Sequence, residues 1–400
     1  MPFENPQNII RSWNLQSNFA TGPVVQDKLT PPTYGRIRSN FIPTWREEQL
    51  DSRLDWGVQN FSVYLPESLR VVSSIYLHIA VPANSNSAAY KKYVGLHALK
   101  TFRILSGGQE VYSCDVPTML GDYCQSLREE ELSVFAKTYL GHQDSMDETA
   151  RHIMVPLLLP NSAYGSRNGH DSRGHGVFPA YLGNQRLELQ FSMNAAANLS
   201  GTGGQGPTSI SGLCKLMYHE VQMTDANLKK YQDARGGYSI INRRFTELTS
   251  GWQEYSAANA LVSFRHTQPQ GTVTEIQVVA VADFSDDETR ATFAYIKPTS
   301  IKIIADAIVQ RDLDTVQKVN AELWTNGFVA PADFPSPGRM CFANHAAEGT
   351  HYYSGGYNMT LASNVDIEFK FASACRYKIW AVQLQRVKID SAGRMRAFLE

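Results

Sequence analysis

The feature of this sequence that most limits its fold is a series of strand-like segments that occurs twice in the same order. In each copy, segments of alternating apolar and polar residues precede a turn-linked strand pair, a helical stretch and two final strands. The first copy comprises residues 61–65, 69–81, 100–112, 116–140, 185–193 and 213–223, and the second comprises 260–265, 273–282, 300–311, 312–324, 364–371 and 377–389. Chance pairing among the strands of an all-β chain is the alternative, but the shared order and helix position favour a duplicated unit.

The spacing between matching segments supports this interpretation. Ile276 follows Ile75 by 201 residues, and Ile301 follows Phe102 by 199 residues. The spacing later falls to 180 residues, because the first copy carries longer loops. About eight short strands per copy, with long insertions, are typical of a jelly roll, in which two Greek-key sheets pack together. The predicted fold class is all-β: two tandem eight-stranded jelly-roll β-sandwiches with short helices in the connecting loops.

The chain is expected to divide into four parts. Residues 1–55 are rich in Pro, Asn and Gln and carry isolated aromatics such as Trp45, which indicates an extended arm lying on a neighbouring surface. Residues 56–223 are predicted to form the first jelly roll and 238–400 the second. Residues 224–237 are polar and end in Gly236-Gly237, and we interpret them as the linker.

Composition narrows the function. The 37 Lys and Arg residues balance 38 Asp and Glu residues, and only 19% of residues are charged. A dedicated nucleic-acid binder would carry a basic excess, whereas a near-neutral surface favours association with copies of itself. The five scattered cysteines show no metal-binding spacing and indicate ordinary, partly buried thiols in a reducing compartment. We expect no signal peptide and no membrane-spanning helix, since no apolar run approaches 18 residues.

Three polar or glycine-rich segments could carry chemistry, but two are better explained as surface loops and the third, residues 144–148, as a surface turn or an acid-rich helix start. Residues 201–206 (GTGGQG) fit a dinucleotide-binding pattern, yet a strand rather than a helix follows them. The remaining candidates lack the spacing of a metal site, and they are His170, Asp171 and His175 in one loop and Asp144, Asp147 and Glu148 in another. The sequence therefore predicts no catalytic, cofactor-binding or metal-binding residue and no enzyme activity.

Two stretches carry a resemblance to a known family. Residues 153–160 (IMVPLLLP), followed by 178–191 (FPAYLGNQRLELQF), and residues 354–369 (SGGYNMTLASNVDIEF) resemble segments of the double jelly-roll major capsid proteins of icosahedral DNA viruses. The likeness in overall order covers most of residues 56–390. The family includes proteins of large eukaryotic DNA viruses and of tailless bacteriophages.

The resemblance implies a major capsid protein that forms pseudo-hexagonal homotrimers, which tile an icosahedral shell around a DNA genome. The implied partners are other copies of the chain, neighbouring trimers, and minor capsid or penton proteins. The arm would lie inward, near neighbours or an internal membrane, and no sequence-specific contact with nucleic acid is expected. The protein would be located in the virion capsid after synthesis in the host cytoplasm.

Two alternative functions stay open on sequence grounds. A two-domain β-sandwich protein that binds or cleaves carbohydrate would also be rich in aromatic residues. A minor capsid or spike protein could share the same fold.

Overall fold

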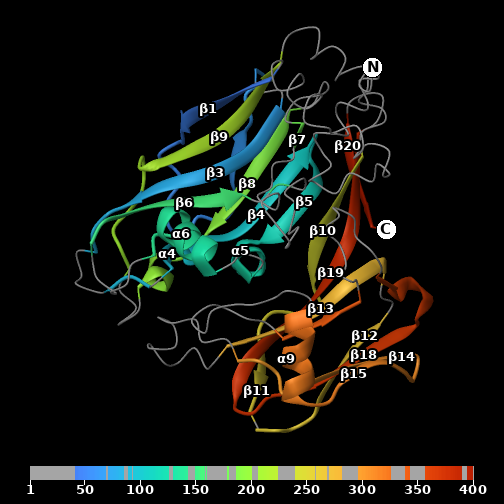
Figure 1. The fold of residues 1–400 in the computed structure, drawn as a ribbon. Helices are drawn as coiled ribbons and strands as arrows, with labels where there is room; N and C mark the ends of the chain where they lie inside the picture. Colours follow the sequence, from blue (N-terminus) through green and yellow to red (C-terminus); the bar gives the residue numbers. More distant parts are fainter. Residues whose placement is uncertain are drawn as a thin grey trace.

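In the computed structural model, the described part of the chain forms two β-sandwiches joined side by side (Figure 1). The described residues are 41–68, 71–84, 89–91, 93–125, 129–142, 149–157, 159, 178–179, 186–200, 206–223, 239–256, 258–267, 270–281, 296–325, 338–342, 356–389 and 394–399. Within them, no helix is long and apolar enough to span a membrane.

The first sandwich consists of two antiparallel sheets. One sheet has the order β1-β9-β3-β6, with a short strand β7 added to β3. Its strands are β1 (Phe41–Gln49), β9 (Cys214–Met223), β3 (Val71–Val81), β6 (Arg151–Leu157) and β7 (Phe178–Pro179). The other sheet has the order β2-β8-β4-β5 and contains β2 (Phe61–Tyr64), β8 (Leu187–Met193), β4 (Leu99–Ser106) and β5 (Gln109–Asp115). Short helices lie in the connections: α4 (Val94–Ala98), α5 (Val116–Gln125), α6 (Glu129–Tyr139) and the 3₁₀ turn η2 (Ala196–Leu199).

The second sandwich repeats this arrangement. Its first sheet has the order β10-β19-β13-β16 and contains β10 (Ser239–Glu247), β19 (Cys375–Ile389), β13 (Thr272–Val281) and β16 (Gly338–Cys341). Three strands extend that sheet: β11 (Gln253–Tyr255), β17 (Tyr357–Asn358) and β20 (Met395–Leu399). The second sheet has the order β12-β18-β14-β15 and contains β12 (Val262–Thr267), β18 (Asn364–Lys370), β14 (Ser300–Ala305) and β15 (Ile308–Leu313). The connections of this half contain the helix α9 (Val316–Thr325) and the 3₁₀ turn η4 (Met359–Leu361).

The predicted fold class is confirmed by this strand order. In both halves, each four-strand path joins corresponding strands in the same sequence, as expected for two jelly rolls. Even an irregularity is repeated, because the register shifts between Ile104 and Leu105 in the β4–β5 hairpin and between Ile303 and Ile304 in the β14–β15 hairpin. The turn predicted within residues 100–112 lies at Gly107-Gly108, with positive φ angles of 56° and 79° that glycine adopts without strain.

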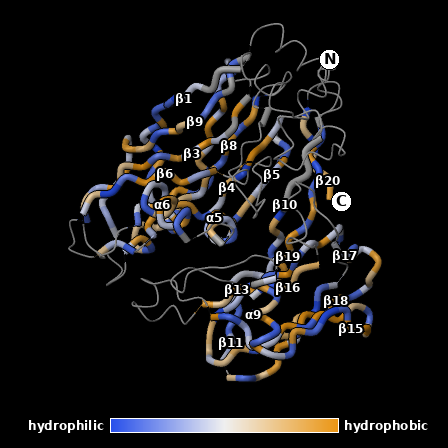
Figure 2. The backbone as a smooth tube through the Cα atoms, in the orientation of Figure 1, coloured by the Kyte–Doolittle hydropathy of each residue, from blue (hydrophilic) through white to orange (hydrophobic). Residues whose placement is uncertain are grey.

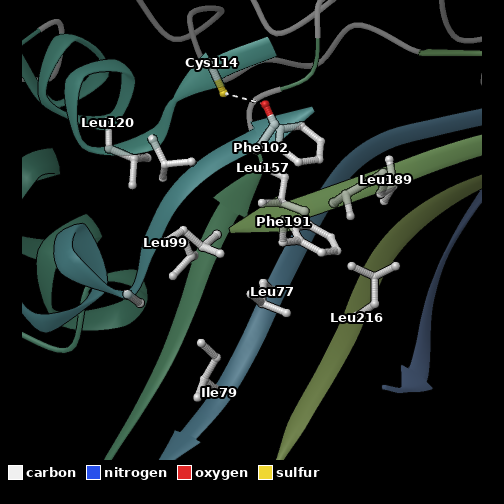
Figure 3. Close-up of a cluster of buried hydrophobic side chains, with 14 of the residues drawn as sticks. Leu77, Ile79, Leu99, Phe102, Cys114, Leu120, Leu157, Leu189, Phe191 and Leu216 are labelled. Atoms are coloured by element: carbon white, nitrogen blue, oxygen red, sulfur yellow. Dashed lines mark hydrogen bonds between the residues drawn. The ribbon is translucent and has the colours of Figure 1, made fainter. Parts of the chain in front are cut away.

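Alternating side chains build the core of each sandwich. Along β8, Leu187, Leu189 and Phe191 point inward and are buried, whereas the residues between them are partly exposed. The ring of Phe191 stacks on that of Phe102 from β4, with 5.7 Å between centroids (Figure 3). Full burial of one such side chain stabilises the fold by about 1.5–3 kcal/mol. The same alternation of apolar and polar positions runs along strands of both halves (Figure 2).

The structure differs from the sequence-based expectation at two points. Residues 41–49, which the sequence analysis placed within the N-terminal arm, form β1 and pair along their whole length with β9. The predicted helical stretch 116–140 contains two helices, α5 and α6, rather than one. Residues 1–40 of the arm and the linker 224–237 lie outside the described residues.

Candidate assembly surfaces

The outer face of the second half's first sheet is buried within the chain. We use "outer face" for the side of a sheet that points away from its own sandwich core. On β10, β13 and β19 this face carries an apolar cluster of its own, formed by Phe245, Val279, Trp380 and Val382. Phe245 is only 7% exposed. An outer face with this chemistry is a contact surface rather than a solvated one.

The first half meets this face with α5 and β5. The side chain of Gln277 on β13 donates a hydrogen bond to Asp122 on α5, with 3.2 Å between Nε2 and Oδ1. Strands β10 and β20 contact β5. Val387 on β19 and Met395 on β20 belong to the same apolar cluster as the first half's core. The C-terminal strands of the second half therefore complete the packing of the first half (Figure 1).

A buried ionic cluster lies at the centre of this contact. The guanidinium of Arg339 on β16 is fully buried, contacts Asp122 and lies 3.2 Å from Oε2 of Glu275. Close by, Glu322 on α9 accepts a hydrogen bond of 2.8 Å from the backbone N–H of Cys341 and pairs with Arg311 at 2.8 Å. Removing a charge from water is costly unless it is paired, so this cluster ties the halves together only while all its members are present.

A second polar contact lies at the end of β5. Burial raises the pKa of Asp115, and hydrogen bonds from Thr118 and the positive charge of Lys378 oppose that rise. The negative charge of Glu247 also raises the pKa of Asp115, and Glu247 itself pairs with Lys378 at 3.4 Å. Asp115 of the first half thus lies beside a Glu–Lys pair on the outer face of the second half.

The first half has an equivalent outer face. Trp45 pairs with His219 across β1 and β9, as Phe245 pairs with Val382 across β10 and β19. The ion pair between Glu47 and Lys215, at 3.0 Å, occupies the position of the pair between Glu247 and Lys378. The two outer faces therefore share both register and one ion pair.

This equivalent face is open in the single chain. Trp45 is 52% exposed, although its ring contacts those of His219 and Tyr76 at centroid distances of 4.9 and 5.7 Å. His78 and His152 stack at 5.5 Å on the same side of the sheet. Burial and nearby Tyr139 raise the pKa of Tyr76 to about 12, so its phenol stays neutral. Aromatic side chains of this kind are enriched where proteins bind one another.

The elements that cover the second half's face also have open counterparts. Helix α5 is buried along most of its described length, whereas its counterpart α9 is exposed at most positions. Val116, at the start of α5, is fully buried, whereas Val316, at the start of α9, is 44% exposed. Ile308 and Val309 on β15 are also exposed. Each chain therefore leaves exposed one sheet face, that of β1 and β9, and one edge, formed by β15 and the start of α9. These two surfaces correspond to the two sides of the contact between the halves.

The structure assigns no chemistry to the loop segments considered in the sequence analysis. The segments with His170, Asp171 and His175 and with Asp144, Asp147 and Glu148 lie outside the described residues, as do 201–205. Gly206 packs so closely on the backbone of Ala196 that a Cβ atom has no room, which is a packing reason for glycine. Among the described residues, no group of His, Cys, Asp and Glu could hold a metal ion.

Sequence reasoning missed the open face because it did not recognise β1. The missing signal was the second copy: residues 44–47 (TWRE) lie 200 positions before 244–247 (RFTE). Aligning those two segments would have placed Trp45 on a strand, at the position equivalent to that of the buried Phe245. The sequence analysis did associate the isolated aromatics of this region with a neighbouring surface.

Comparison with known proteins identifies the fold. Neither a protein-family model nor a curated protein sequence matches the chain. Among solved structures, a chain of the PBCV-1 virus capsid matches with a TM-score of 0.65 and 12% identity, over 90% of this chain and 96% of that chain. The Faustovirus major capsid protein matches with a TM-score of 0.60 and 11% identity, over 90% of each chain. The mavirus major capsid protein gives 0.54 and 9%, also over 90% of each chain. The chain therefore has the double jelly-roll fold of viral major capsid proteins.

Proposed function

We propose that this protein is a major capsid protein that assembles as pseudo-hexagonal homotrimers and tiles an icosahedral shell around a DNA genome. The observation that carries the proposal is the open outer face of the sheet β1-β9-β3-β6 in the first half. The same face of the corresponding sheet β10-β19-β13-β16 in the second half is buried against the first half, so the chain holds one filled and one unfilled copy of a single contact. The fold shared with viral major capsid proteins agrees with this role.

The duplication supports a trimer. Two similar sandwiches per chain give six per trimer, so a trimer can occupy a lattice position with six neighbours. An interface whose two sides differ continues from copy to copy and closes into a ring when the rotation between copies brings the last copy back to the first. The near-neutral balance of 37 basic and 38 acidic residues limits repulsion between the copies.

The other parts of the proposal concern partners and location. The protein functions without enzymatic activity, in the virion capsid, after synthesis in the host cytoplasm. Neighbouring trimers and minor capsid or penton proteins are its partners. Residues 1–40 extend from β1 toward neighbours or an internal membrane, and residues 224–237 link the two jelly rolls.

Mass measurement and imaging test this function together. Light scattering at micromolar concentration should give about 130 kDa, three times the 44.6 kDa chain, and electron microscopy should show pseudo-hexagonal particles. A stable monomer at that concentration contradicts the proposal. Deleting residues 1–40 should leave the trimer intact and impair shell assembly, whereas loss of the trimer would contradict the role given to the arm.

A further inference from the structure

We propose that β15 and the start of α9 of one copy bind the open outer face of β1, β9 and β3 in the next copy, head to tail. We call these two surfaces the open edge and the open face. The open edge comprises Ile308, Val309, Asp314 and Val316. The open face comprises Trp45, Glu47, Lys215, Met217 and His219, and it is bordered by Tyr76, whose ring stacks on that of Tyr139 from α6. The inference rests on the proposed self-association and specifies which surfaces carry it.

The first argument is the equivalence of the two outer faces. Across the paired strands, Trp45 corresponds to Phe245 and Met217 to Trp380. Phe245 and Trp380 are buried on the face whose Gln277 and β10 contact α5 and β5 of the first half, whereas Trp45 remains half exposed. The open face is thus a second copy of a surface that the same chain already covers with α5 and β5.

The second argument is the equivalence of the covering elements. In the β4–β5 hairpin, Phe102 pairs with Cys114, and in the β14–β15 hairpin, Ile301 pairs with Leu313. Asp314 therefore corresponds to Asp115 in the hairpin register, although α9 begins two residues after Asp314 whereas α5 begins directly after Asp115. The open edge has the strand, turn and helix that make the internal contact, and it exposes apolar side chains that the internal contact would cover.

Charge supports the same pairing. Inside the chain, Asp115 lies beside the pair of Glu247 and Lys378. The corresponding arrangement between copies places Asp314 beside Glu47 and Lys215. In the single chain Asp314 pairs with Lys318 on its own helix at 2.9 Å, with both side chains about half exposed. Such an exposed pair contributes little stability, so Asp314 can exchange it for Lys215 of a neighbour.

Because the open face and the open edge differ, each copy binds one neighbour through its open face and another neighbour through its open edge. An interface of this kind is heterologous, whereas a two-fold contact would bring identical surfaces together. This difference gives the proposal a specific test, since two variants that each lack one surface can still form one intact contact with each other.

The test uses Trp45→Asp on the open face and Val316→Asp on the open edge. Each variant should be monomeric at a concentration where the unmodified protein is trimeric. The dissociation constant of the contact between copies should rise at least about tenfold, as for loss of a central aromatic contact. An equimolar mixture of the two should form a species of two chains, detected by light scattering. Matched controls are Tyr64→Asp, 53% exposed on the other sheet, and Leu261→Asp, 57% exposed beside β12 at the opposite edge from β15. Both controls should remain trimeric.

The outcomes separate this inference from the proposed function. If the unmodified protein is trimeric but either test variant is also trimeric, or the mixture stays monomeric, the head-to-tail pairing is wrong and the capsid role stands. If the unmodified protein is itself monomeric, the proposed function fails and this inference fails with it.

Carbodiimide cross-linking of the unmodified protein gives a second measurement that needs no variant. In trimers mixed from isotopically light and heavy chains, a link between Lys215 and Asp314 should join peptides of different copies. The link between Lys215 and Glu47, which are 3.0 Å apart within one copy, is the internal control. Recovery of the control link without the link to Asp314 overturns the proposal.

Discussion

Replacing Arg339 by methionine tests the ionic cluster that joins the two jelly rolls. Methionine keeps much of the side-chain volume but removes the charge that lies between Asp122 and Glu275. Arg339 and Glu275 are fully buried and Asp122 is nearly so, so the two carboxylates would remain together in a poorly solvated site. Breaking a buried ion pair by removing one partner costs about 3–5 kcal/mol. We therefore expect Arg339→Met to lower the free energy of unfolding by about 4 kcal/mol.

Two further variants separate charge from packing. Arg265→Met removes an exposed pair with Asp366, at 2.7 Å, and should cost no more than about 1 kcal/mol. The triple variant Arg339→Met, Asp122→Leu, Glu275→Leu removes the whole cluster and should recover most of the loss, because no buried charge is left unpaired.

Urea unfolding, followed by tryptophan fluorescence and circular dichroism, measures these changes. The reasoning is refuted if Arg339→Met costs no more than Arg265→Met. It is also refuted if the triple variant is as unstable as the single one, since the loss would then reflect packing rather than uncompensated charge.

Three other predictions follow from burial. Met395→Ala should lower the free energy of unfolding by about 2–5 kcal/mol in urea titrations, because β20 packs into the first half's core; a cost near zero would show that the strand is peripheral. Burial, together with His152 and Lys215, lowers the pKa of His78 below 6.5. The unfolded chain then binds more protons, so stability should fall as the pH drops below 6.5, and less so in His78→Gln, as followed by thermal unfolding at a series of pH values; identical profiles would contradict this. All five cysteines are buried, and burial raises the pKa of Cys214 and Cys375 to about 12. The native protein should therefore not react with a thiol reagent at pH 8, whereas the denatured chain should show five reactive thiols; labelling of the folded protein would argue against this burial.

The sequence was informative wherever a strand buries one regular face. The alternation of Leu187, Leu189 and Phe191 is local and depends only on the period of two in a β-strand, so β8 could be predicted directly. The order of such segments then gave the duplication and the fold class. Both are properties that need no knowledge of which strands meet in space.

Strand β1 could not be recognised in that way. Within residues 44–49, its side chains on the core side are polar and have partners on β9: Arg46 pairs with Glu220 at 2.6 Å, and Tyr218 donates to Glu48 at 3.5 Å. Trp45, the one aromatic residue of this stretch, faces outward instead. An edge strand with polar side chains toward the core and an aromatic side chain outward lacks the usual strand pattern, so its sequence alone indicates an irregular segment. The residues that pair with its polar side chains lie about 170 positions away in the sequence.

The contact between the halves was beyond the reach of sequence patterns for a related reason. Arg339 lies 217 positions from Asp122 and 64 from Glu275, and charged residues are normally expected at the surface. Only the packing of β16 and β13 against α5 makes their burial favourable. The candidate surfaces likewise required the structure, since the sequence contains no site motif to mark them.

The two outer faces have diverged in the way their different exposure requires. Both carry the Glu–Lys pair, but the buried face surrounds it with Val279, Val382 and the ionic cluster, which suit a contact that never opens. The open face has His78 and His219 at the corresponding positions, beside half-exposed Trp45. Imidazole and indole rings combine a large contact area with a polar atom, so they tolerate water in the free chain and still bury well in a complex. This difference is expected if one contact forms during folding and the other during assembly.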